Sequence, residues 1–243
     1  MKLLAINAVS KNFGGLQALH EISFHVNSGE VLGMIGANGA GKTTLLSLIA
    51  GHERPSSGEI LFRGEPIVGL RPDQLARRGI ARTFQNVRPF PGMTVLDNVL
   101  VPIFFGAGRQ HNRSVAKELA IEILTEVELQ DRRDRLASSL TLSDQKRLEI
   151  ARALGTQPIL IMLDEVMAGL TGTEVNRLLQ SIQVVQRRRS LTIVFVEHVM
   201  QAVMRLSDRV VVLHHGRLIT TGSPESVGKD PRVIEAYLGP SDD

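Results

Sequence analysis

The chain has no cysteine, no strong excess of either charge and no long apolar run, and each absence narrows its function. Without a thiol, the 243 residues form no disulfide, carry out no thiol catalysis and offer no thiolate metal site. No stretch approaches the roughly 18 consecutive apolar residues of a membrane span, so we expect no direct membrane insertion. Residues 1–7 are too short and turn polar too soon for a signal peptide, and we expect none there.

The charge is nearly balanced, because 28 lysines and arginines oppose 25 acidic residues and leave a net charge of +3. That excess is too small to indicate a nucleic-acid partner, and we expect none. The chain is 43% hydrophobic and 22% charged, as in an ordinary globular protein. Its length suffices for one large domain or for a core with inserted subdomains.

One glycine-rich segment carries the strongest functional signal. The apolar run 31–35 leads into a turn of small residues, after which Lys42 and Thr43 begin a helix. Small residues with a free φ let several backbone N–H groups converge on phosphate oxygens, and the helix N-terminus adds partial positive charge. Lys42 would reach the β- and γ-phosphates, and the Thr43 hydroxyl would bind Mg²⁺. The sequence therefore predicts a P-loop that binds ATP or a related triphosphate. Its predicted binding residues are Gly36, Asn38, Gly39, Gly41, Lys42, Thr43 and Thr44.

The apolar patterns predict an α/β fold with a mainly parallel sheet and crossover helices. Short apolar runs separated by helical stretches are typical of buried parallel strands. Before them, Ile22, Phe24 and Val26 alternate with polar residues and indicate an antiparallel strand ending in the turn 27–30. The predicted parallel strands are 31–35, 159–163, 191–196 and 209–213.

Between residues 90 and 140 the strand signal disappears, and helical spacing takes its place. We expect an inserted helical subdomain there, with an apolar stripe that is simple core. The predicted organisation is a single domain over 1–243. Its parts are an N-terminal β subdomain with the P-loop (1–89), the helical subdomain (90–150) and the rest of the core (151–243). The stripe consists of Ala116, Leu119, Ala120, Ile123, Leu124 and Val127.

An acidic pair follows one of the predicted strands. Asp164 and Glu165 come directly after the run 159–163. Such a pair alone is more often a solvated loop, but a P-loop requires a carboxylate at the end of a neighbouring strand. In that setting Asp164 would orient Mg²⁺, and Glu165 would polarise the attacking water as a general base.

With these motifs in this order, the chain resembles the ATP-binding subunit of ABC transporters over nearly its whole length. The resemblance implies that Gln85 binds Mg²⁺, senses the γ-phosphate and links the core to the helical subdomain. It implies that His198 contacts the γ-phosphate and that Phe13 stacks on adenine. Taken alone, His198 is more often a structural residue and Phe13 an edge-strand core residue.

The signature turn is where the chain departs from this family. The family has Leu-Ser-Gly-Gly-Gln before a helix and uses it to bind ATP held on the opposite subunit. Here Thr141 keeps the hydroxyl, Ser143 replaces a glycine, and Asp144 replaces the neutral glutamine. Two interpretations of Asp144 remain open: it caps the helix, or it repels the γ-phosphate and slows one of two composite sites. In the loop that crosses the dimer interface, Thr171 stands where the family usually has aspartate.

These departures favour pairing with a different, related ATP-binding subunit over a homodimer. The segments 79–90, 93–99, 164–170 and 230–239 further resemble the subunits of branched-chain amino-acid importers. The resemblance implies an ATPase motor that acts on integral-membrane permease subunits at the cytoplasmic face of the inner membrane. Alternatives are a motor for urea or amide import and a nucleotide-sensing module with little hydrolysis. A small-molecule kinase would not explain Gln85 and His198 together with the signature-like helix.

Overall fold

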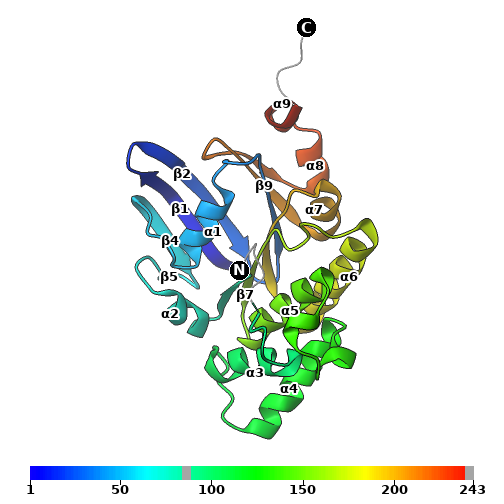
Figure 1. Cartoon of the computed structure of the whole chain (residues 1–243). Helices are drawn as coiled ribbons and strands as arrows, with labels where there is room; N and C mark the ends of the chain where they lie inside the picture. The colour runs from blue at the N-terminus through cyan, green and yellow to red at the C-terminus, as the bar shows by residue number, and fades with distance from the viewer. Residues whose placement is uncertain (84–88, 239–243) are drawn as a thin grey trace. The chain divides into compact units, whose positions relative to one another are not determined.

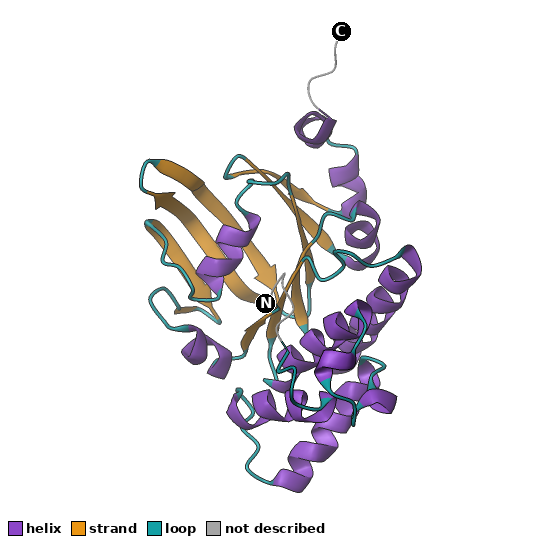
Figure 2. Ribbon diagram, viewed as in Figure 1, coloured by secondary structure: helices purple, strands orange, loops and turns teal. Residues whose placement is uncertain are grey.

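A computed structural model describes residues 1–83 and 89–238, so the predicted Gln85 lies outside the described residues. The chain forms two compact units (Figure 1). Unit 1 comprises Met1–Pro72 together with Thr192–Asp243, and unit 2 comprises Asp73–Leu191. Strands dominate unit 1 and helices dominate unit 2, as Figure 2 shows by colour.

The N-terminal part of unit 1 is an antiparallel sheet with the strand order β2-β1-β4-β5. The predicted alternation in β2 is confirmed, because Ile22, Phe24 and Val26 are all buried. The turn after β2 follows the prediction as well, with the Glu30 N–H donating to the Asn27 carbonyl at 3.2 Å. The strands are β1 (Lys2–Phe13), β2 (Leu16–Asn27), β4 (Ser57–Phe62) and β5 (Glu65–Pro66).

A second set of strands in unit 1 surrounds β3, every residue of which is buried. β3 pairs in parallel with β8 on one side and β9 on the other, and β10 pairs antiparallel with β9. Strands buried on both faces read as continuous apolar runs, which is why these segments were visible in the sequence. The elements are β3 (Val31–Ile35), β8 (Thr192–Val196), β9 (Arg209–His214), β10 (Arg217–Gly222), α1 (Lys42–Ile49), α7 (Met200–Leu206), α8 (Pro224–Gly228) and α9 (Pro231–Leu238).

Unit 2 combines a short parallel strand pair with packed helices. β6 and β7 pair in parallel, and α3, α4 and α5 pack against one another (Figure 1). The predicted stripe is the buried face of α4 and its C-cap, apart from Leu119, which is half-buried. The elements are α2 (Pro72–Arg77), β6 (Ile80–Arg82), α3 (Val95–Phe105), α4 (Arg113–Glu126), the 3₁₀ helices η1 (Gln130–Arg132) and η2 (Ala137–Ser139), α5 (Leu142–Gly155), β7 (Leu160–Asp164) and α6 (Gly172–Arg189).

Polar side chains begin the main helices of unit 2. Thr94 accepts from the Asp97 N–H at 3.0 Å and starts α3, and Asn112 accepts from the Ser114 N–H at 2.9 Å and starts α4. These caps satisfy N–H groups that a helix cannot bond internally. Among the described helices, none combines the length and the apolar composition that crossing a bilayer requires.

Candidate nucleotide-binding site

The predicted P-loop connects β3 to α1 in unit 1, and a buried lysine closes it. Lys42, only 5% exposed, donates from Nζ to the carbonyl of Gly36 at 2.6 Å and to that of Ala37 at 3.0 Å. The Ala40 N–H also donates to the Ala37 carbonyl at 3.1 Å. The loop thus folds around an ammonium group while Asn38, Gly39 and Thr43 remain exposed.

Two glycines of this loop cannot be replaced without moving the backbone. Gly36 has φ +157°, and a Cβ there would overlap the carbonyl oxygen of Leu213. Gly41 has φ +98°, and a Cβ there would lie 2.5 Å from Leu19 Cδ2 and 2.9 Å from the Ala18 carbonyl oxygen. These positions therefore require glycine, as the sequence predicted for a phosphate-binding turn.

The N-terminus of α1 is suited to an anion. Gly41 is its N-cap, and within the described stretch 36–49 no side chain caps the helix and its first turn carries no acidic residue. The first N–H groups of a helix lack partners inside the helix, and its dipole places partial positive charge there. Together with the Lys42 ammonium, this end of α1 can hold phosphate oxygens.

Asp164 is the last residue of β7 in unit 2, and its carboxylate is 3% exposed. Its Oδ2 accepts from Arg82 Nη2 at 2.8 Å, and Arg82 ends the neighbouring strand β6. The backbone N–H of Asp164 donates to Thr83 Oγ1 at 3.2 Å. Within residues 1–83 and 89–238, no hydrogen-bond partner meets the other carboxylate oxygen, Oδ1, although it is buried.

The buried Oδ1 of Asp164 allows a test of whether the residues present fit a metal ion. Mg²⁺ prefers oxygen ligands and takes one or two carboxylates in sites that also hold phosphates. A buried carboxylate oxygen lacking a donor is costly unless a cation or water meets it. The donor set at Asp164 therefore fits Mg²⁺, and its role as a magnesium ligand stays a prediction.

Glu165 follows Asp164 in an unusual backbone conformation. Its φ is +50°, in the left-handed region that residues other than glycine seldom adopt. The residue is half-buried, and its carbonyl accepts from the Ala168 N–H at 3.3 Å, which turns the chain away from β7. Backbone outliers of this kind cluster at functional sites, because the surrounding structure must hold them.

His198 and Phe13 are both exposed residues of unit 1. His198 comes two residues after β8 and directly follows Glu197, which is 3% exposed. Phe13 ends β1 and is 44% exposed, with Lys11 Nζ 4.6 Å from its ring centroid. Phe13 is therefore not a core residue, and its ring is accessible.

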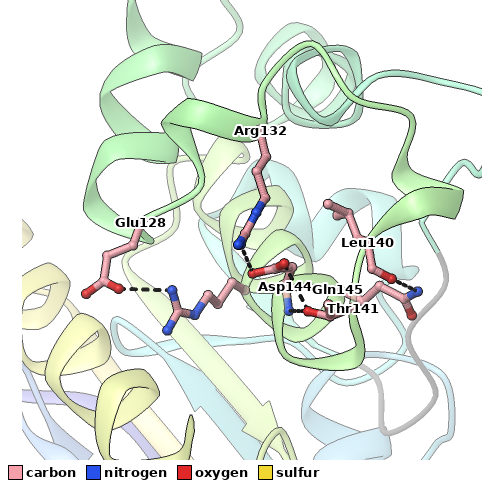
Figure 3. A network of polar contacts seen from close by, with 7 residues as sticks. Glu128, Arg132, Leu140, Thr141, Asp144 and Gln145 are labelled. Atoms are coloured by element: carbon pink, nitrogen blue, oxygen red, sulfur yellow. Dashed lines mark hydrogen bonds and ion pairs between the residues drawn. The ribbon is translucent and has the colours of Figure 1, made fainter.

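The signature turn is a helix cap. Thr141 is the N-cap of α5, and its Oγ1 accepts from the Asp144 N–H at 3.3 Å and donates to Asp144 Oδ2 at 2.9 Å (Figure 3). Arg132 Nη1 pairs with the other carboxylate oxygen, Oδ1. Asp144 is 5% exposed and Ser143 is 8% exposed. Thr141 therefore caps α5, and the Asp144 carboxylate lies beside its hydroxyl, while the effect of Asp144 on an ATP site stays a prediction.

Arg132 is the residue that sequence reasoning missed at this turn. It ends the short helix η1, and its side chain is 41% exposed. Neither a motif nor a periodic pattern surrounds it, and it lies 12 positions before Asp144. No signal in the chain predicted the pair.

Thr171 is likewise a helix cap. It begins α6 in a capping box with Glu174, whose Oε2 accepts from the Thr171 N–H at 2.9 Å and from its hydroxyl at 2.8 Å. The Thr171 backbone N–H, followed by its hydroxyl, lowers the pKa of the Glu174 carboxyl below its ordinary value of 4.5. The threonine that replaces the expected aspartate therefore has a clear local role.

A buried strand, a glycine loop closed by a lysine and an uncapped helix define a P-loop nucleotide-binding protein of the α/β class. The family model "ABC transporter" matches residues 19–168, which is more than half of the chain. A second model, "Branched-chain amino acid ATP-binding cassette transporter", matches residues 217–239. The chain belongs to the ATP-binding cassette family of ABC transporters, and as such it is an ATP-binding ATPase subunit.

Curated relatives match along nearly the full length. The chain is 39% identical over 249 residues to the high-affinity branched-chain amino acid transport ATP-binding protein LivG of Salmonella typhimurium, covering 98% of each. It is 38% identical over 249 residues to the corresponding protein BraF of Pseudomonas aeruginosa, again covering 98% of each.

Solved structures of ATP-binding cassettes have the same fold as this chain. A nucleotide-free ATP-binding cassette from an ABC transporter superposes with a TM-score of 0.88 at 31% identity, covering 99% of this chain and 100% of that one. The ADP conformation of such a cassette gives the same values. The predicted α/β P-loop ATPase fold is confirmed.

Proposed function

We propose that the chain is the ATP-hydrolysing motor of an importer for branched-chain or other hydrophobic amino acids. The observation that carries the proposal is the match of residues 217–239 to the branched-chain amino acid cassette model. The relatives LivG and BraF, which are named as high-affinity branched-chain amino acid transport proteins, support it.

In this function the P-loop and the end of α1 hold the phosphates of ATP. The family resemblance assigns Mg²⁺ to Thr43, Asp164 and Gln85, and the buried Oδ1 supports the role of Asp164. When bound, Mg²⁺ neutralises charge on the β- and γ-phosphates.

Three further residues have proposed roles. Glu165 takes the proton of the attacking water, as its position after the strand that ends in Asp164 suggests. His198 contacts the γ-phosphate, and its exposure leaves it accessible. Phe13 stacks on adenine, which its exposed ring supports.

The proposed partners are integral-membrane permease subunits and a second, related ATP-binding subunit at the cytoplasmic face of the inner membrane. Pseudomonas aeruginosa has two branched-chain amino acid transport ATP-binding proteins, BraF and BraG, and this chain is 33% identical to BraG. That pair favours a heterodimer. ATP would stabilise the closed dimer, with Thr141 and Ser143 facing its γ-phosphate, and hydrolysis would reopen it.

Two substitutions test the assigned chemistry. Glu165→Gln should reduce ATP turnover by at least about 100-fold while ATP affinity stays within about twofold, because the amide cannot accept the proton. Lys42→Ala should weaken ATP binding itself by more than about tenfold, because it removes the ammonium at the loop. Glu118→Gln, at an exposed position of α4, is the matched control. Retention of wild-type hydrolysis by Glu165→Gln would show that the base lies elsewhere.

A purification tests the assembly and the cargo. The tagged chain is recovered from native membranes in mild detergent, and its companions are identified by mass spectrometry. A second ATPase with two multi-span permeases supports the importer. ATP-driven uptake of leucine or of urea by the reconstituted complex then distinguishes an amino-acid importer from an amide importer. Recovery without membrane partners, together with little hydrolysis, would replace the motor with a nucleotide-sensing role.

A further inference from the structure

We propose that Arg132 is a positioning residue of the signature turn 140–144. It holds the Asp144 carboxylate against the first turn of α5 and balances its charge, so that the turn can accept a γ-phosphate. This assignment rests on the proposed function, because it takes the signature turn to meet ATP held by another cassette. The signature here carries a carboxylate in place of a neutral side chain, and Arg132 compensates for that exchange.

Both oxygens of Asp144 are engaged. Oδ2 accepts from Thr141 Oγ1 at 2.9 Å, and Oδ1 pairs with Arg132 Nη1. The Asp144 side chain is 8% exposed and that of Arg132 is 41% exposed. The carboxylate is therefore largely out of water, and the more exposed guanidinium of Arg132 faces it (Figure 3). A carboxylate in this environment depends strongly on its partner.

The backbone places Arg132 independently of the ion pair. Its N–H donates to the Leu129 carbonyl at 3.0 Å, and its own carbonyl accepts from the Arg135 N–H at 3.0 Å. Leu129 is 1% exposed and anchors the segment. Truncation of the Arg132 side chain should therefore leave the scaffold in place and remove mainly the charge.

The neighbouring cation of the network already has a partner. Arg147, one turn further along α5, donates from Nη1 to Glu128 Oε2 at 3.0 Å. Arg147 and Glu128 balance each other, and Arg132 is the cation that pairs with Asp144 within residues 1–83 and 89–238. Without Arg132, the first turn of α5 would carry an uncompensated negative charge where a phosphate approaches.

The expected consequence is electrostatic. A negative charge within about 8 Å of a phosphate, at an effective dielectric constant of about 20, weakens binding by roughly tenfold or more. The unpaired carboxylate would also offset the partial positive charge at the N-terminus of α5, which would otherwise favour the phosphate. Salt should reduce the effect, because the site is partly solvated.

The test measures the apparent KM for ATP, kcat and Tm in the assembly recovered with the tagged chain. Arg132→Ala should raise the KM roughly tenfold, and Arg132→Lys should raise it less, because lysine restores the charge. The double variant Arg132→Ala with Asp144→Gln should return the KM to that of Asp144→Gln alone. Arg133→Ala is the matched control and should leave the KM unchanged, because this half-buried neighbour pairs with Asp134 instead.

Salt dependence separates charge from folding. The rise in KM for Arg132→Ala should shrink by at least half in about 0.5 M salt. A lowered Tm with an unchanged KM would mean that the pair only stabilises the helix, and it would overturn the assignment. A raised KM that Asp144→Gln fails to rescue would overturn it as well.

The proposed function can fail separately. If the wild-type assembly binds ATP but does not hydrolyse it, the proposed motor role is wrong. The affinity of the same variants for a fluorescent ATP analogue then decides the role of Arg132. A tenfold loss rescued by Asp144→Gln supports the assignment, and equal affinities overturn it.

Discussion

The ion pair between Arg82 and Asp164 should dominate the stability of the strand pair β6 and β7. Both side chains are nearly buried, at 9% and 3% exposure, with Nη2 and Oδ2 2.8 Å apart. Arg82→Ala would leave Asp164 with no cation at Oδ2, in addition to an Oδ1 that no donor meets within the described residues. Removing one partner leaves an uncompensated buried charge, which lowers the free energy of unfolding much more than replacing both residues with uncharged ones.

The magnitude follows from this burial. Breaking a buried pair by removing one partner costs about 3–5 kcal/mol. A chain of this length loses about 2–4 °C of Tm per kcal/mol, so we expect a fall of roughly 10 °C. Replacing both residues, as Arg82→Met with Asp164→Asn, should recover most of this loss because no charge remains buried.

Thermal unfolding followed by circular dichroism measures the effect. Arg133→Ala serves as the control, since its pair with Asp134 is exposed at 43% and 83% and should be worth less than about 1 kcal/mol. A Tm for Arg82→Ala within about 2 °C of wild type would refute the reasoning. So would a double variant no more stable than the single one.

Two further predictions concern unit 1. Gly36→Ala should weaken ATP binding by more than about tenfold in an equilibrium binding assay, because its Cβ would displace the loop. Gly172→Ala, where an added Cβ meets nothing within 4 Å, should not. Hydrogen bonding from Arg232 lowers the pKa of Asp230 from 3.8 to about 2. The stability this pair contributes is therefore present above pH 3.8 and is lost as the pH falls through about 2. In a carboxyl NMR titration, Arg232→Ala should return the pKa toward 3.8, and an unchanged value would contradict the assigned cause.

The parts of the fold that sequence predicted well are those with a strong local pattern. β3 spans Val31–Ile35 as predicted, because a strand buried on both faces is apolar throughout. Strand β7 was predicted over 159–163 and is observed over Leu160–Asp164, a shift of one residue that brings Asp164 into the strand. The P-loop was predictable because phosphate chemistry requires glycine and lysine at set spacings.

Contacts between distant residues were not predictable. Arg82 lies 82 positions from Asp164 and ends a three-residue strand, too short for any periodic signal. Arg132 pairs with Asp144 from a 3₁₀ turn that carries no motif. The discontinuous unit 1, to which the chain returns at Thr192, has no boundary signal in composition. The predicted division at residues 89 and 150 and the role of Gln85 stay predictions.

Because the backbone at Glu165 is left-handed, the residue that suits the proposed ATPase activity differs from the residues that would give the highest thermal stability. Glycine or asparagine would adopt φ +50° at lower cost than glutamate, so either should make the folded chain harder to melt. Either would also remove the proposed base. In a library of variants selected only for heat resistance, substitutions of Glu165 should therefore accumulate together with loss of ATPase activity. Selection for transport would instead retain the strained glutamate.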